Sequence, residues 1–209
     1  MRLYTYFRSS AAYRVRIALN LKGLAYESVP VNLLKRENTE AGFRHVNPQG
    51  RIPALEREDG TVLVQSPAIL EYLEETHPEP ALLPRDPVAR ARVRAAAALV
   101  ACDIHPLNNV GPLRYLKNGF GQEQPAIDTW IAHWITQGFS ALEAMLEPGP
   151  FAFGATPGMA DLYLVPQVYN ARRFKVPLEA FPKITAVDAA CTAHDAFAAA
   201  APERQPDAA

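Results

Sequence analysis

Residues 6–23 read Tyr-Phe-Arg-Ser-Ser-Ala-Ala-Tyr-Arg-Val-Arg-Ile-Ala-Leu-Asn-Leu-Lys-Gly. A short run of alternating polar and apolar side chains leads into this stretch and predicts a β-strand. Within it, apolar side chains recur every four residues, at Tyr13, Ile17 and Leu21, and Gly23 is a typical stop signal. The sequence therefore predicts a strand that turns directly into a helix.

Two serines, Ser9 and Ser10, lie at this strand-to-helix turn. The first N–H groups of a helix have no partner within it, and the helix dipole adds positive charge at the same end. Such a position favours an anion. Serines there can also serve only as helix caps. Arg8 beside the pair, together with matching motifs further along the chain, favours a functional interpretation.

Composition limits the possible functions. The chain has 209 residues, of which 49% are hydrophobic, so it can form one globule or two small domains with real cores. Its net charge of -1 provides no overall field toward nucleic acid or an anionic membrane. No run approaches the roughly 20 apolar residues that span a bilayer, and the N-terminus lacks an apolar leader. We expect a cytoplasmic protein without nucleic-acid or membrane partners.

Cysteine and histidine spacing gives no sign of metal or thiol chemistry. The two cysteines, Cys102 and Cys191, form no CxxC pair, which argues against a disulfide framework or a thiol redox site. The histidines are scattered without the spacing of metal ligands. We expect no metal site.

The first third of the chain alternates strand and helix patterns. Asp59-Gly60 marks a hairpin turn, and Ser66-Pro67 opens a helix with serine at the N-cap and proline at the first helical position. The expected elements after the first helix are a strand at 25–31, an irregular or helical segment at 34–46, strands at 54–58 and 61–64, and a helix at 66–75. This order is β-α-β-α-β-β-α.

The rest of the chain is predicted to be helical. A proline-rich stretch at 77–87 is typical of a linker between domains. Helices are expected at 88–103, 125–147, 159–172 and 184–200, with a frayed end from Pro202 onward. The predicted domains are residues 1–80, mixed α and β, and residues 87–209, all-helical.

This layout resembles the α/β plus all-α fold of the cytosolic glutathione transferases, with a thioredoxin-like N-terminal domain and a helical-bundle C-terminal domain. Within them the chain resembles the zeta class, the maleylacetoacetate isomerases. The signature of that class is close to Ser-Ser-Cys-x-x-Arg-Val-Arg-Ile-Ala-Leu-x-Leu-Lys-Gly, which residues 9–23 match at every specified position except Ala11. Four further motifs match in order: Asn47-Pro48 with Ile52-Pro53, Gln65-Ser66, residues 103–109 (Asp-Ile-His-Pro-Leu-Asn-Asn), and Met159-Ala-Asp-Leu with residues 170–176 (Asn-Ala-Arg-Arg-Phe-Lys-Val).

The resemblance implies a glutathione-dependent isomerase. Glutathione thiolate would add to a cis alkene, allow rotation and leave again, turning maleylacetoacetate into fumarylacetoacetate in tyrosine breakdown. Maleylpyruvate isomerisation and glutathione transfer to small α-haloacids remain open as alternatives. So does a glutathione-binding protein without turnover, although a scaffold would need neither Arg8 nor Ser9. Members of this family usually form homodimers.

The resemblance also assigns roles to single residues. Ser9, with Ser10 beside it, would be catalytic by donating a hydrogen bond to the glutathione sulfur. Arg8 and Arg173 would bind the carboxylates of a dicarboxylate substrate, with Arg172 or Lys175 as substitutes for Arg173. The residues that would bind glutathione are Ser9, Ile52, Pro53, Gln65, Ser66, His105 and Asn109, with Ile52-Pro53 as a cis peptide and His105 either a hydrogen-bonding group or a buried structural histidine.

Two positions depart from the family pattern. Ala11 stands where the signature has cysteine, which excludes any mechanism that uses a protein thiol there. Asp161 resembles the capping aspartate of a buried helix, but its usual Ser or Thr partner three residues earlier is Gly158. That cap can therefore use only the backbone of Gly158.

Overall fold

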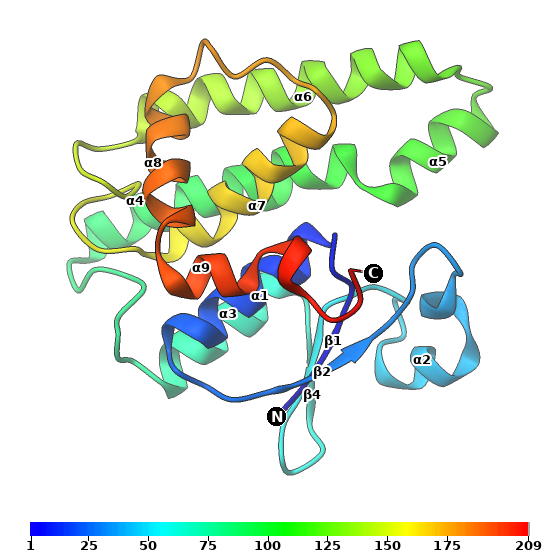
Figure 1. Cartoon of the computed structure of the whole chain (residues 1–209), viewed down its shortest axis with the longest axis horizontal. Coiled ribbons are helices and arrows are strands. Elements are labelled where there is room, and N and C mark those ends of the chain that lie inside the picture. The colour runs from blue at the N-terminus through cyan, green and yellow to red at the C-terminus, as the bar shows by residue number, and fades with distance from the viewer. Residues whose placement is uncertain (209) are drawn as a thin grey trace. The chain divides into compact units, whose positions relative to one another are not determined.

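The computed structural model describes residues 1–208, which form two compact units (Figure 1). One unit comprises residues 1–82 together with the chain from Ala193 onward, and the other comprises Leu83–Thr192. The α/β plus all-α fold class is confirmed. The predicted second domain, 87–209, differs from the second unit because the C-terminal segment lies with the first.

The first unit is built on a four-stranded mixed sheet in the order β2-β1-β3-β4. β1 pairs with β2 in parallel, and β3 pairs antiparallel with both β1 and β4. The strands are β1 (Arg2–Thr5), β2 (Glu27–Pro30), β3 (Ala54–Glu56) and β4 (Val62–Val64). They are shorter than the alternating sequence runs suggested, but their number and order confirm the predicted pattern.

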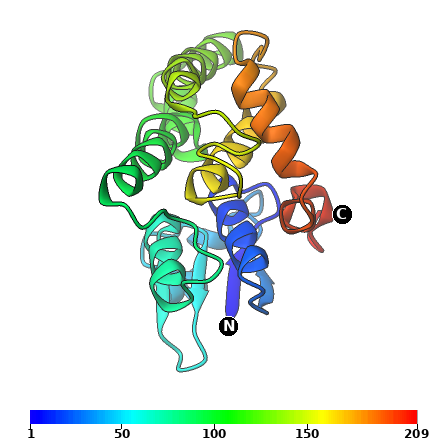
Figure 2. The same ribbon diagram turned by 90° about the vertical axis from the view of Figure 1, so that its left-hand side faces the viewer.

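Helices cover both faces of this sheet (Figure 1). α1 (Ser10–Leu21) and α3 (Ser66–Thr76) lie side by side on one face (Figure 2), and α2 (Ala41–Val46) covers the other. Successive side chains of β1 face opposite sides of the sheet, so they contact different helices. Thr5 is buried toward α1, where it bonds to Arg16, whereas Tyr4 meets Phe43 of α2 with ring centroids 5.9 Å apart.

The C-terminal segment of the first unit is packed as far as it is described, so the predicted fraying is wrong for residues 202–208, while Ala209 lies outside the described residues. Pro202 and Gln205 are buried, and Gln205 Nε2 donates to the carbonyls of Ala199 and Ala201 at 3.0 Å each. The helix predicted at 184–200 is two helices, α8 (Pro182–Thr192) and α9 (Asp195–Ala200), followed by the 3-10 turn η4 (Pro202–Arg204). His194 Nδ1 caps α9 by accepting from Ala196 N at 3.2 Å.

The second unit is helical throughout its regular elements. Its members are α4 (Pro87–Ala98), the π-helical stretch η2 (Leu99–Ile104), the 3-10 turn η3 (His105–Asn108), α5 (Val110–Gly119), α6 (Gln124–Met145), α7 (Met159–Arg173) and α8. The apolar stripe of α6, which includes Ile131, Ile135, Phe139 and Leu142, is buried as its spacing predicted. α5 was not predicted because Gly111-Pro112 in its first turn is typical of a loop.

The start of α7 is closed by Asp161, as expected for a cap that lacks Ser or Thr. Asp161 Oδ2 accepts from Gly158 N at 2.8 Å, and Asp161 N donates to the Gly158 carbonyl at 3.1 Å. The other carboxylate oxygen, Oδ1, accepts from Ala152 N at 2.9 Å. Burial raises the pKa of Asp161, and these N–H donors partly offset that effect. The role of Asp161 is therefore structural.

A buried ion pair fixes the end of α1 in the first unit. Lys22 Nζ lies 3.0 Å from Glu74 Oε2 of α3 and donates to the carbonyls of His77 (2.6 Å) and Pro80 (3.1 Å). Glu74 in turn accepts from Leu82 N. These contacts attach the segment after α3 to both helices.

In the described part of the chain, residues 1–208, we find no helix with both the length and the apolar character needed to cross a bilayer.

We predict that Lys22→Met lowers the free energy of unfolding by about 3–5 kcal/mol, because it leaves the buried Glu74 carboxylate without this cation. Denaturant unfolding would measure the change. Arg92→Met is the matched control, since the Arg92–Glu147 pair is exposed and spans 3.6 Å. An equal loss in both variants would contradict the structural role of the buried pair.

Candidate active site

The register of the sheet brings three predicted segments to one edge of the first unit. Tyr4 pairs with Ala54, and Ala54 pairs with Val64. The chain beyond β1, before β3 and beyond β4 therefore meets at the same edge. These segments carry Ser9, Ile52-Pro53 and Gln65-Ser66. Tyr6 and Ile52 accordingly belong to one buried cluster with Val31 and Phe43.

Ser9 is the N-cap of α1. Its Oγ accepts from Ala12 N at 3.2 Å, which is the simple capping role. A hydroxyl oxygen accepts and its proton can donate at the same time, so the cap leaves a donor for a bound anion. Ser9 is half-buried, whereas Ser10 is buried at 7% exposure. Of the two serines, Ser9 is thus the one with accessible surface.

The Ile52-Pro53 peptide bond is cis, as predicted. Asn47 supports the turn before it, with Nδ2 donating to the Arg51 carbonyl at 2.5 Å and Oδ1 accepting from Gln49 N at 3.0 Å. The Ile52 side chain is buried in the cluster with Tyr6. The start of β3 is therefore held at the edge to which α1 also points its N-terminus.

The third segment turns from β4 into α3. Gln65 has a left-handed backbone, with φ of 70°, and its Nε2 donates to Gln49 Oε1 at 2.6 Å. Ser66 opens α3 and is buried, and its Oγ accepts from Arg14 Nη1 at 3.4 Å. A second helix N-terminus thus lies at this edge, which makes it favourable for anions.

Arg16 holds the turn before Ser9 from inside the unit. This side chain is fully buried, and its guanidinium donates to Thr5 Oγ1 (3.1 Å) and to the carbonyls of Phe7 (3.0 Å) and Ala200 (3.0 Å). Asp207 adds a contact from the C-terminal segment, since its Oδ2 accepts from Phe7 N at 2.9 Å. Sequence analysis missed Arg16, Arg14 and Asp207, because nothing in a helical pattern shows that an arginine is buried.

Arg8 lies on this same turn. Its Nη2 donates to Tyr6 Oη at 3.2 Å, and its Cζ lies 5.0 Å from the centre of the Phe7 ring. Neither contact neutralises the positive charge. Arg8 therefore lies next to Ser9 in the chain with a positive charge that can attract a carboxylate.

The remaining predicted residues belong to the second unit. His105 opens η3 and is half-buried, and Asn109 caps α5, its Oδ1 accepting from Val110 N at 2.8 Å. Trp130 Nε1 of α6 donates to the Leu107 carbonyl at 2.7 Å and so anchors the turn between them. His105 and Asn109 thus flank one fixed turn.

Two neighbouring arginines at the end of α7 have different partners. Arg172 Nη1 lies 2.6 Å from Asp188 Oδ2 of α8. Burial raises the pKa of Asp188, and Arg172 partly offsets that effect. Arg173 Nη2 instead donates to the amide oxygen of Asn170 at 2.8 Å, and its Cζ lies 4.3 Å from the centre of the Phe174 ring. Arg172 thus forms a structural ion pair with Asp188.

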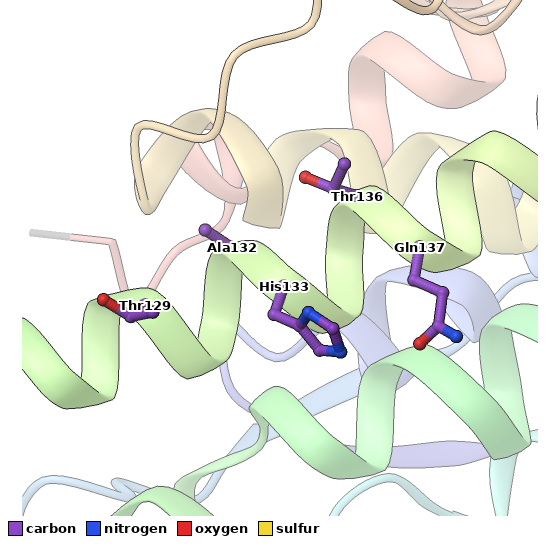
Figure 3. Close-up of a pocket in the computed structure, with 5 residues that line it drawn as sticks. All are labelled: Thr129, Ala132, His133, Thr136 and Gln137. Atoms are coloured by element: carbon purple, nitrogen blue, oxygen red, sulfur yellow. The ribbon is translucent and has the colours of Figure 1, made fainter.

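A separate depression lies on the surface of α6, and none of the predicted residues line it (Figure 3). It is open to solvent and has a volume of about 510 Å³. Its five lining residues come from one face of one helix: Thr129, Ala132, His133, Thr136 and Gln137. Because these lining residues include no Asp, Glu, Lys or Arg and all come from α6, the depression is a weaker candidate site than the sheet edge.

Neither of the two cysteines, Cys102 and Cys191, belongs to the first unit. Both are free and belong to the second unit. Cys191 is buried with Sγ 3.6 Å from Asp161 Oδ1, and burial together with this carboxylate raises the pKa of its thiol. Among residues 1–208, no three His, Cys, Asp or Glu side chains gather as a metal site would require.

Comparison with family models gives two matches. Residues 8–76 match the N-terminal domain of glutathione S-transferase, and residues 124–187 match its C-terminal domain. The maleylacetoacetate isomerase of Pseudomonas aeruginosa is 52% identical over 209 residues, covering 99% of this chain and 98% of that protein.

Comparison with solved structures also finds isomerases of this kind. The holo structure of a bacterial maleylpyruvate isomerase, described as a zeta-class glutathione S-transferase, has a TM-score of 0.97 and 53% identity, with both chains fully covered. A maleylacetoacetate isomerase from Methylobacterium extorquens AM1, solved with bound malonate and GSH, has a TM-score of 0.96 and 40% identity, again with full coverage of both chains.

Proposed function

The chain belongs to the glutathione transferases, and within them to the zeta class, and on that basis we propose that it is a glutathione-dependent cis-trans isomerase of maleylacetoacetate. The observation that carries the proposal is the sheet edge where Ser9, the cis Ile52-Pro53 peptide and Ser66 meet. This edge combines two helix N-termini, the backbone segment that leads into β3, and a hydroxyl donor. Those are the groups that a tripeptide with two carboxylates and a thiol requires.

In this proposal, different residues of the edge bind different parts of the tripeptide. Gln65 and Ser66 bind the γ-glutamyl carboxylate at the N-terminus of α3. Ile52, held by the cis bond to Pro53, pairs its backbone with the cysteinyl part in the manner of an added strand. Ser9 Oγ then donates to the sulfur, and Ser10 supports the turn. We also assign His105 and Asn109 to glutathione binding.

The chain's own contribution to catalysis is to keep the sulfur ionised and the substrate oriented. Bound glutathione supplies a thiolate that adds reversibly to the alkene, so that the former double bond can rotate before the thiolate leaves. The Ser9 hydroxyl and the positive end of α1 both stabilise the thiolate over the thiol. Arg8 and Arg173 hold the two substrate carboxylates, which fixes the alkene relative to the sulfur.

Maleylpyruvate isomerisation is the second candidate. The chain is 53% identical to a maleylpyruvate isomerase from Ralstonia sp. and 52% identical to the maleylacetoacetate isomerase from P. aeruginosa. Both substrates would present two carboxylates and a cis alkene, so the same arginines and the same sulfur would serve either one.

We further propose that the enzyme works in the cytoplasm as a homodimer. The dimer is proposed by analogy with the family. Two free cysteines suit a reducing compartment, where glutathione is available as a thiol. In this assignment the first unit binds glutathione.

The direct test is an ultraviolet assay of the purified protein with maleylacetoacetate and with maleylpyruvate, each with and without glutathione. We expect turnover that depends entirely on glutathione, with the preferred substrate decided by kcat/KM. Tight glutathione binding without turnover of either compound would support a binding protein instead.

We predict that Ser9→Ala lowers turnover by roughly 10²-fold or more, the scale of losing one donor to a developing charge. The pKa of enzyme-bound glutathione should rise, so the pH–rate profile should move to higher pH. Asp86→Ala is the matched control, since it also removes an N-cap, with Asp86 Oδ2 accepting from Ala89 N at 2.8 Å. Equal turnover in wild type and Ser9→Ala would dismiss Ser9 as the donor.

We predict that Arg8→Ala and Arg173→Ala each raise KM for the dicarboxylate roughly tenfold or more while leaving glutathione affinity unchanged, because each removes a charge-assisted contact to substrate. Steady-state kinetics with either compound varied in turn would measure both constants. Lys175→Gln removes an exposed charge two residues from Arg173 and should have little effect. A loss of glutathione affinity instead would show that the arginines are misassigned.

A further inference from the structure

Arg173 is connected to the turn that carries His105 and Asn109 through two buried amides. Arg173 Nη2 donates to Asn170 Oδ1 at 2.8 Å, and Asn170 Nδ2 donates to Asn108 Oδ1 at 2.9 Å. Asn170 and Asn108 are 4% and 3% exposed, so water competes little for these bonds. All members of this chain of contacts belong to the second unit.

From these contacts we propose that Asn170 is a positioning residue that sets the Arg173 guanidinium for a substrate carboxylate, with Asn108 orienting Asn170. This inference rests on the proposed function, because it names what a dicarboxylate ligand requires of the chain. It adds two residues, Asn108 and Asn170, that would touch neither substrate nor glutathione.

The chemistry of the acceptor supports this role. An amide oxygen is neutral, so its bond to Arg173 orients the guanidinium without offsetting the positive charge. The neighbouring Arg172 bonds to a charged acceptor, the Asp188 carboxylate, at 2.6 Å. A carboxylate at position 170 would compete with the substrate for the same cation.

The Asn170 amide is bonded at both of its ends. An amide can turn over and exchange its oxygen and nitrogen, and only the oxygen accepts from arginine. Asn170 Oδ1 accepts from Arg173, and the Nδ2 group at the other end donates to Asn108 Oδ1, so the two bonds favour the same orientation of the amide. The backbone of the η3 turn that carries Asn108 is held in place, since the Leu107 carbonyl accepts from Trp130 Nε1 of α6.

Phe174 restricts the guanidinium from another side. The Arg173 Cζ lies 4.3 Å from the centre of the Phe174 ring, within cation–π range. A long side chain held by a ring and an amide loses fewer conformations when a carboxylate binds. The expected benefit is therefore tighter dicarboxylate binding rather than faster chemistry.

The test measures malonate binding by isothermal titration calorimetry to the full-length protein saturated with glutathione. We predict that Asn170→Ala weakens malonate binding about tenfold, the scale of one hydrogen bond to a charged group. Asn170→Asp should weaken it at least as much, because the new carboxylate neutralises Arg173. Glutathione affinity should not change in either variant.

Gln167→Leu is the matched control. Gln167 lies one turn earlier in α7, is fully buried, and neither of its amide atoms has a hydrogen-bond partner within residues 1–208. It should keep wild-type malonate affinity. If Asn170→Ala fails to fold, Asn170→Asp alone is sufficient for the test, since aspartate is similar in size to asparagine and keeps an oxygen acceptor.

Several outcomes would overturn the inference. It fails if malonate affinity is the same in Asn170→Asp as in wild type while Arg173→Ala loses it. It fails equally if Arg173→Ala binds malonate as wild type does, or if Gln167→Leu loses as much affinity as the Asn170 variants. A wild-type protein that binds malonate but turns over neither maleyl substrate would refute the proposed function and leave this positioning role standing.

Discussion

Antiparallel pairing of β3 with both β1 and β4 is the constraint on which the first unit depends. Since β1 and β4 run in the same direction, both lead their chains to one edge of the sheet, and β3 begins there. The helices that follow β1 and β4 must then start at that edge, with their positive ends together. The candidate site is therefore a consequence of strand register, and a slip of one residue would turn Ile52 out of its cluster.

Buried cations hold this edge in place. Arg16 satisfies backbone carbonyls from the turn before Ser9 and from α9, while Arg14 reaches Ser66 at the start of α3. Burying a guanidinium is unfavourable unless its N–H groups are hydrogen-bonded. The buried arginines therefore favour the conformation in which these acceptors stay in contact with them. Packing of the C-terminal segment and shape of the Ser9 turn are thus coupled through one side chain.

The sequence allowed the fold class and the order of strands and helices along the chain to be predicted, and the cis Ile52-Pro53 bond was expected from the family resemblance that its motifs carry. It did not reveal the burial of Arg16, since one of its acceptors, the Ala200 carbonyl, lies 184 residues along the chain. The break near His194 was hidden by alanine-rich sequence that favours helix on both sides. α5 was missed for the opposite reason, since its Gly111-Pro112 start suggests a loop although Asn109 caps a helix there.

The absence of a cysteine at position 11 determines what the site must do. Every cysteine of the chain belongs to the second unit, and Cys191 is buried beside Asp161, where its thiol resists ionisation. A serine hydroxyl at a helix N-terminus is a weak nucleophile by itself but a good donor. Ser9 is therefore suited to stabilising a sulfur anion that a ligand brings, and the positive end of α1 favours that anion over the neutral thiol. In the proposed mechanism the protein supplies the field and the ligand supplies the sulfur, so activity requires that the tripeptide first binds at the sheet edge.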